Sequence, residues 1–259
     1  MNFFYGISND LFKSEIQIPL FQNRNFKKSN LKLFKSYPKN NKWILQEISS
    51  KKINDYFYIL KNEDILSNEI FFLADETILN EFDDKKLKNF NNFTDTSPAF
   101  RANFKIYLNQ GGFSSYQSEY PYSMITKKGT ILSSISSIAN SDADKNYVLI
   151  KNIFEEPIEE NFRAYLVNYK TKSIEEQFEI KTNYTNCIEI SNKLIKPEIF
   201  LTTDKYLGIP MYVSVKNSFL SFEHTHPPHE YILSENKFIK VTNFKKEINE
   251  IINKKISKY

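Results

Sequence analysis

The second half of the chain is a series of short runs rich in β-branched and aromatic residues, and this pattern restricts the fold more than any other feature of the sequence. Polar turns separate the runs at intervals of roughly 8–12 residues, which is typical of antiparallel sandwiches and barrels. The pattern lacks the long helices that a parallel sheet needs between its strands. The runs are residues 147–154, 162–169, 177–181, 187–190, 199–203, 210–215, 219–222 and 231–233. We therefore expect a mainly β protein with an antiparallel β-sandwich or jelly-roll-like body.

The composition agrees with a β-rich fold. The chain contains 23 Phe and 16 Tyr, and aromatic residues favour strands over helices. Only 5 Gly and 9 Pro are available for turns. We therefore expect Asn, Asp and Ser to form most turns, because these residues tolerate left-handed backbone conformations.

The first half of the chain predicts a second β-rich region. Its short apolar or alternating runs are residues 43–48, 55–60 and 69–74. A short helix is expected at 79–90, and a polar loop at 91–98 indicates a boundary. The sequence thus divides into an N-terminal β-rich region, 1–98, and a sandwich domain, 99–259.

The C-terminal tail changes from strand to helix periodicity. Its apolar residues recur at helical spacing, with Lys and Glu between them. They are Phe244, Ile248, Ile251, Ile252 and Ile256. This pattern predicts an amphipathic helix packed on the sheet of its own chain. The alternative is a helix that docks a second subunit in a homo-oligomer.

The charge pattern argues against a nucleic-acid partner. The net charge of +4 arises from 35 basic and 31 acidic residues, and the lysines are interleaved with glutamates. A nucleic-acid binder usually presents a dense basic stripe. The acidic run at 155–160 flanks a turn and is interpreted as solvated surface charge.

Cysteine usage and the N-terminal sequence predict a cytoplasmic location. Cys187 is the only cysteine, so an intrachain disulfide is excluded, which fits a reducing compartment. The first residues lack the basic and apolar segments of a secretory signal. No run approaches the roughly 18 apolar residues that span a bilayer, so we expect no membrane partner.

All three histidines of the chain lie within six positions, at His224, His226 and His229, and Glu230 follows at once. Imidazole is the commonest protein ligand for metals. His224 and His226 are two residues apart, so both would point to one face of an extended strand. The two intervening prolines end strand pairing and could return His229 or Glu230 toward the first two histidines. The segment therefore predicts a divalent metal site.

Three ligand sets are compatible with this segment. Three imidazoles would give the open site of zinc hydratases and hydrolases. His224 and His226 with Glu230 would give the two-histidine, one-carboxylate set that non-haem iron enzymes use. A structural metal would need a fourth protein ligand. The candidates for it are Glu223, Asp204 and Cys187.

The spacing His224-x-His226-x-x-x-Glu230 resembles the first half of the cupin metal motif. Cupins are small β-barrels that hold iron, manganese, nickel or zinc, and the resemblance implies such a metal here. It covers these seven positions only. Cupins supply a further histidine from a later strand, whereas no histidine follows His229, and residues 231–259 are too few to complete such a barrel.

A second resemblance concerns residues 147–222. The short strands around Asn152, Asn168 and Asn186, followed by the run Gly208–Val213, look like the small β-sandwich of the sensory rhodopsin transducer type. This resemblance implies a binding or assembly module without catalysis.

A polar aromatic segment, Phe113–Met124, is the candidate pocket wall. Its substrate-binding candidates are Tyr116, Gln117, Glu119 and Tyr122. Such a segment often lines a polar surface or cleft. The alternative is an aromatic loop that packs on the sheet.

Two functions follow from these features. The first is a metal-dependent enzyme that acts on a small polar substrate, a sugar or an organic acid. It would use zinc or iron held by His224 and His226, with Glu230 as ligand or catalytic general base. The alternative is a non-catalytic β-sandwich module that binds carbohydrate or a protein partner through exposed tyrosines and Trp43.

Overall fold

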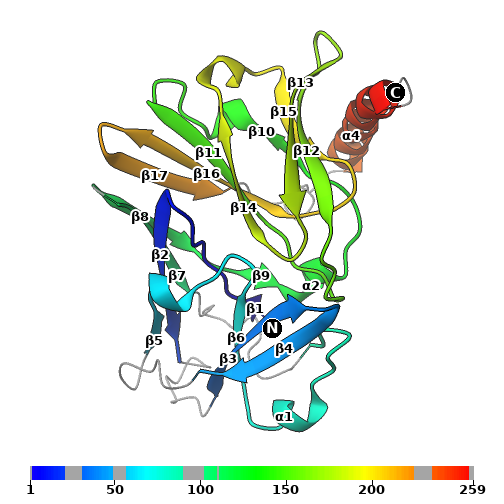
Figure 1. Ribbon diagram of the computed structural model, residues 1–259. Coiled ribbons are helices and arrows are strands. Elements are labelled where there is room, and N and C mark those ends of the chain that lie inside the picture. Colours follow the sequence, from blue (N-terminus) through cyan, green and yellow to red (C-terminus); the bar gives the residue numbers. More distant parts are fainter. Residues whose placement is uncertain are drawn as a thin grey trace.

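The computed structural model describes residues 2–20, 31–48, 57–89, 102–109, 111–224 and 235–256. The protein is mainly β, as the sequence predicts, and every strand pair within these residues is antiparallel (Figure 1). A long helix, α4 (Glu235–Ile256), follows the last strand.

The C-terminal part contains two four-stranded sheets that face each other. In sheet order, the outer sheet contains β10 (Leu132–Ser134), β15 (Ile199–Thr203), β12 (Asn161–Asn168) and β13 (Ser173–Lys181). The middle sheet contains β14 (Thr185–Ile190), β11 (Lys145–Lys151), β16 (Ile209–Lys216) and β17 (Phe219–His224). Side chains of both sheets, such as Val148 and Leu166, form one buried apolar cluster between them. This arrangement is the expected sandwich.

The N-terminal part adds three further sheets. One contains β5 (Phe57–Leu60), β2 (Phe12–Pro19), β7 (Asn103–Leu108) and β8 (Phe113–Gln117), and another contains β4 (Lys42–Glu47), β3 (Lys32–Lys39) and β6 (Ile70–Ala74). The third pairs β1 (Asn2–Phe3) with β9 (Tyr120–Pro121). Two of these sheets therefore combine strands from both sides of position 98, and the division at that position stays a prediction.

The middle sheet is buried on both faces. Along β11, Val148 and Ile150 enter the core of the sandwich, whereas Tyr147 and Leu149 join the core of the N-terminal part. Successive side chains of a strand point to opposite faces, so a strand covered on both sides must be apolar at every position. This explains why the run at 147–150 is continuously hydrophobic rather than alternating. In Figure 1 the N-terminal part lies below this sheet, and the outer sheet and α4 lie above it.

Asparagine and serine form the tight hairpin turns, as the scarcity of glycine predicts. Asn40 and Asn41 join β3 to β4 with φ angles of 55° and 59°. Asn217 and Ser218 join β16 to β17 with φ angles of 49° and 66°. Two-residue hairpin loops with positive φ at both positions match the right-handed twist of the flanking strands.

The short helices are single turns. They are η2 (Asn62–Asp64), α1 (Ile78–Glu81), α2 (Tyr122–Ile125), η3 (Ile135–Ser137) and η4 (Asn192–Leu194). The helix expected at 79–90 is therefore wrong in length. After α1 the chain turns at Asp83, whose carboxylate accepts a hydrogen bond from the Lys85 amide, and the Leu87 amide then donates to the carbonyl of Glu155.

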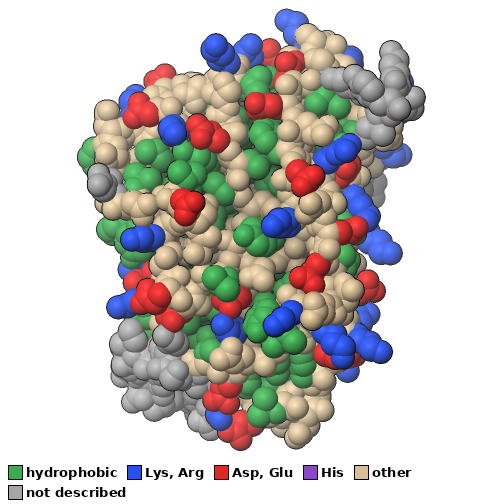
Figure 2. All heavy atoms as spheres, viewed as in Figure 1, with side chains coloured by type: hydrophobic (Ala, Val, Ile, Leu, Met, Phe, Trp, Pro, Cys, Tyr) green, Lys and Arg blue, Asp and Glu red, His purple; other side chains and the backbone are tan. Residues whose placement is uncertain are grey.

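The C-terminal helix covers the outer face of the outer sheet, as the sequence predicts. Ile248 and Ile252 pack with Tyr165 and Val167 of β12, and the Phe244 ring lies 4.7 Å from Tyr169 and 4.8 Å from Phe200, between ring centres. Among the described residues, no helix has the length and hydrophobicity needed to cross a membrane. Figure 2 shows basic and acidic side chains interspersed over the face that it presents.

Candidate functional site

Of the four predicted metal ligands in the histidine segment, only His224 lies among the described residues. It is the last residue of β17 and is half-buried. His226, His229 and Glu230 lie outside the described residues. In the part of the chain that the structure describes, no three His, Cys, Asp or Glu side chains gather closely enough to hold a metal ion.

The structure brings one predicted wall residue against His224. The ring of Tyr116, on β8, lies edge-on to the imidazole with 4.2 Å between ring centres. The same tyrosine lies 6.1 Å from Phe222, which is two residues before His224 on the same face of β17. His224 therefore points into the junction between the middle sheet and the sheet that contains β8.

Glu119 belongs to the same neighbourhood. Its carboxylate lies near Tyr5, whose pKa is raised by burial and then by Tyr120 and Glu119. The Tyr5 hydroxyl donates to Sδ of Met211 at 3.4 Å, and Met211 is the cross-strand partner of His224. This junction is thus lined by polar aromatic groups in an otherwise apolar core.

The other predicted wall residues lie differently. Gln117 ends β8 opposite Asn103 of β7. Tyr122 begins α2, and its single hydroxyl proton is shared between two acceptors, Glu155 Oε1 at 3.3 Å and the Leu87 carbonyl at 3.4 Å. Part of the predicted wall therefore contacts the loop that follows β11 and not the histidine.

The proposed fourth ligands do not converge on His224. Cys187, Leu149, Met211 and His224 form one row across the middle sheet, in four successive strands. Three strand spacings separate Cys187 from His224, a distance of about 14 Å. Burial also raises the pKa of the Cys187 thiol to about 12.

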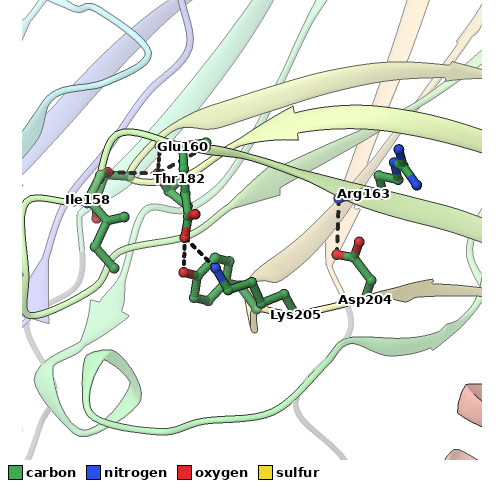
Figure 3. Close-up of polar contacts among 8 residues, drawn as sticks. Ile158, Glu160, Arg163, Thr182, Asp204 and Lys205 are labelled. Carbon is green, nitrogen blue, oxygen red and sulfur yellow. Dashed lines mark hydrogen bonds and ion pairs between the residues drawn. The ribbon is translucent and has the colours of Figure 1, made fainter.

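Asp204 and Glu223 also lie away from the His224 side chain. Asp204 follows β15 of the outer sheet, where its carboxylate accepts a hydrogen bond from the Arg163 amide at 3.1 Å (Figure 3). Glu223 is exposed and, by the alternation of a strand, points to the face opposite His224.

A second candidate site, which the sequence did not predict, is a cleft beside the outer sheet. It has a volume of about 420 Å³ and is lined by residues 125–129, 154–156, 158 and 205–207. We call it the lysine–tyrosine cleft, after Lys127, Lys128 and Lys205 and the ring of Tyr206.

Two walls of this cleft are joined by one buried hydroxyl. Thr203 Oγ1 accepts a hydrogen bond from the Ile131 amide at 2.9 Å and donates to the Tyr206 carbonyl at 2.6 Å. Gly129 has a φ of +145°, and a β-carbon there would lie 3.7–3.8 Å from the Leu207 side chain. The loop thus needs glycine for its backbone conformation and lies directly against the opposite wall.

The aromatic wall is held in place from several sides. The Tyr206 ring lies 4.6 Å from the ring of Phe154 and 5.1 Å from that of Phe162. Its hydroxyl donates to the Glu160 carboxylate, which also pairs with Lys205 at 2.7 Å. These two hydrogen bonds lower the pKa of Glu160, whereas burial is the main cause that raises the pKa of Tyr206.

Glu160 is itself anchored to the neighbouring strand. Its amide donates to Thr182 Oγ1 at 2.9 Å, and the Thr182 hydroxyl donates to the Ile158 carbonyl at 2.7 Å. Figure 3 shows the Glu160 carboxylate directed toward Lys205, with Thr182 and Ile158 on its backbone side. The acidic run at 155–160, interpreted from the sequence as solvated charge, therefore contributes to the wall of the cleft.

The charged groups of the cleft differ in how far they are neutralised. Glu155 pairs with Lys86 at 3.2 Å, and Lys205 pairs with Glu160. Lys128 and Glu156 form no ion pair with any residue that the structure describes. One cation and one carboxylate thus stay available at the cleft within the described parts of the chain.

Trp43 is not the exposed binding platform that the sequence suggested. Its side chain is 1% exposed, and its indole Nε1 donates to the Glu155 carbonyl at 2.9 Å. It therefore anchors β4 of the N-terminal part against the loop that carries one wall of the cleft.

Comparisons with known proteins give this site no precedent. No protein-family model matches the chain, and neither the curated proteins nor the solved structures compared with it gave a match. The cupin-like spacing and the transducer-like strands thus remain local resemblances.

Proposed function

We propose that this protein is a non-catalytic β-sandwich module that binds a carbohydrate in the lysine–tyrosine cleft. The observation that carries the proposal is the fixed ring of Tyr206 beside the available charges of Lys128 and Glu156. Aromatic side chains with a polar tip suit ligands that have an apolar face and hydroxyl groups.

The charges favour an uncharged polyol over an ion. A sugar hydroxyl both donates and accepts hydrogen bonds, so it can donate to the Glu156 carboxylate while another accepts from the Lys128 ammonium. Because Glu155 and Lys205 are already paired, the cleft offers little net charge to a phosphate or a polyamine. Its volume falls within the range of roughly 300–1,000 Å³ that is usual for small-molecule sites.

The test is binding of neutral sugars by the untagged full-length protein. We expect one of glucose, N-acetylglucosamine, maltose or cellobiose to bind with a millimolar or lower Kd in calorimetric titration. Tyr206→Ala should weaken that binding about tenfold, because it removes the aromatic contact. The matched control is Tyr107→Ala, whose ring packs on Phe113 of β8 and not in the cleft. Equal binding by wild type and Tyr206→Ala, or no binding of any of these sugars, would contradict the proposal.

A second candidate function is the metal-dependent enzyme that acts on a sugar or an organic acid. It is favoured by the edge-on contact of Tyr116 with His224, because the candidate wall residue and the candidate ligand lie together. Elemental analysis of untagged protein separates the two functions. Stoichiometric zinc or iron favours the enzyme, and no metal after addition of either favours the binding module.

A further inference from the structure

We propose that α4 is a latch on the lysine–tyrosine cleft: Lys245 holds the carbonyl of Thr130, and the helix thereby fixes the cleft rim, residues 126–130. The effect on ligand affinity rests on the proposed function, whereas the mechanical link between helix and rim does not.

The first support is a hydrogen bond from the helix to the rim. The half-buried Lys245 donates through Nζ to the backbone oxygen of Thr130, immediately after Gly129. Burial lowers the pKa of this lysine. Hydrogen bonds from a charged donor are stronger than those between neutral groups, and partial burial reduces competition from water.

The second support is that the chain at the end of the rim contacts three different parts of the protein. Three consecutive residues are each tied to a different partner. Thr130 accepts from Lys245, Ile131 donates to the Thr203 hydroxyl, and Leu132 packs against the apolar cluster under α4. The helix, the rim and the opposite wall of the cleft are therefore joined within three residues.

The third support is that α4 can detach from the outer sheet without exposing the core of the sandwich. The helix lies on the outer face of the outer sheet, and its buried residues form a cluster separate from that of the sandwich. Elements held by one small cluster open locally at lower free energy than the core does. A partner that captured the apolar face of α4 would thus free the rim and weaken ligand binding.

Amide hydrogen exchange of the full-length protein tests the link without any ligand. In Lys245→Met, which keeps the apolar stem of the side chain, we expect residues 126–131 to exchange about tenfold faster than in wild type, because one hydrogen bond is lost. The amides of β11 and β16 should keep their rates. The matched control is Lys246→Met, which replaces the exposed neighbour and should leave all rates unchanged.

A second variant separates the lysine from the docking of the helix. Phe244→Ala removes the ring contacts with Tyr169 and Phe200 and should speed exchange in both α4 and residues 126–131. Unchanged rates at 126–131 in Lys245→Met, or faster exchange of α4 without the rim in Phe244→Ala, would overturn the latch.

The same four sugars test the effect on binding. Weaker binding by Lys245→Met than by Lys246→Met supports regulation, and equal binding overturns it. If no sugar binds but the exchange results hold, the proposed function fails while the mechanical link stands.

Discussion

Lys151 has the least ordinary environment of the described charged residues. It is completely buried at the end of β11, and its Nζ lies 3.5 Å from the Ser67 carbonyl, 3.4 Å from the Glu69 carbonyl and 5.7 Å from the centre of the Tyr5 ring. Burial lowers its pKa to about 7, against the opposing effect of the Glu69 carboxylate. The amine joins the C-terminal sandwich to the N-terminal part, and no carboxylate of the described residues forms an ion pair with it.

This environment predicts a stability that rises with pH. The unfolded chain keeps the lysine proton up to its ordinary pKa of 10.5, whereas the folded protein releases it near 7. The free energy of unfolding should therefore increase between pH 7 and pH 9, by on the order of 1 kcal/mol per pH unit. The Cys187 thiol, whose pKa burial raises from 9.0 to about 12, acts in the opposite sense from about pH 9 upward. The buried phenols of Tyr5, Tyr120 and Tyr212, whose pKa values are also raised, do so only above about pH 10.

Urea unfolding at pH 7, 8 and 9 measures this dependence. Lys151→Met should remove most of the rise, whereas Lys39→Met, at the exposed end of β3, should retain it. Identical pH dependence in the two variants would show that Lys151 is not the titrating group.

For the metal hypothesis, the residue to change is His224. If untagged protein holds zinc or iron, His224→Ala should release it, because an open site of three ligands cannot easily spare one. Binding should also weaken as pH falls below about 6.5, since imidazolium cannot coordinate a metal. Cys187→Ala is the control and should keep the metal, because Cys187 lies three strands away from His224 in the middle sheet. Metal retained by His224→Ala would rule out this ligand.

Individual elements show how far the sequence determines this fold. The run at 147–150 and the helical spacing of Ile248 and Ile252 are local patterns, and both predicted their elements correctly. The polar segment 113–117 looked like a loop, because an edge strand that is partly exposed lacks the apolar alternation of a core strand. Its pairing with β7, and that of β7 with β2, depend on tertiary contacts that local periodicity does not contain.

The hairpin between β16 and β17 gives a prediction at this scale. Ser218 has a φ of 66° at the second turn position, where a side chain is strained and glycine is not. Ser218→Gly should therefore raise the free energy of unfolding by about 0.5–1 kcal/mol in urea titration. The matched control is Ser221→Gly on an exposed position of β17, where glycine should lower stability by a similar amount. A loss of stability in both variants would contradict the turn assignment.

At the scale of the whole molecule, the lysine–tyrosine cleft forms only because folding brings distant segments together. The lysine–tyrosine cleft combines three segments that are far apart in the sequence, and none of them carries a motif. In the sequence, only Gly129 and the acidic run at 155–160 distinguish these loops, and both features are common on ordinary protein surfaces. The histidine segment was visible because its residues are adjacent, which is why sequence analysis found that candidate and missed the other.

The shared core predicts that the two halves unfold together. The apolar cluster of the N-terminal part includes Leu149 and Met211 of the middle sheet, so separation of the halves would expose one face of that sheet. Trp43 is the only tryptophan, and its indole bonds to the Glu155 carbonyl across the junction. Its fluorescence therefore reports on the junction, while far-ultraviolet circular dichroism reports on all the strands. In urea the two signals should give the same midpoint, as a cooperative unit requires. A fluorescence transition at clearly lower urea would show instead that the N-terminal part, which includes β7, β8 and β9, separates from the sandwich before the sandwich unfolds.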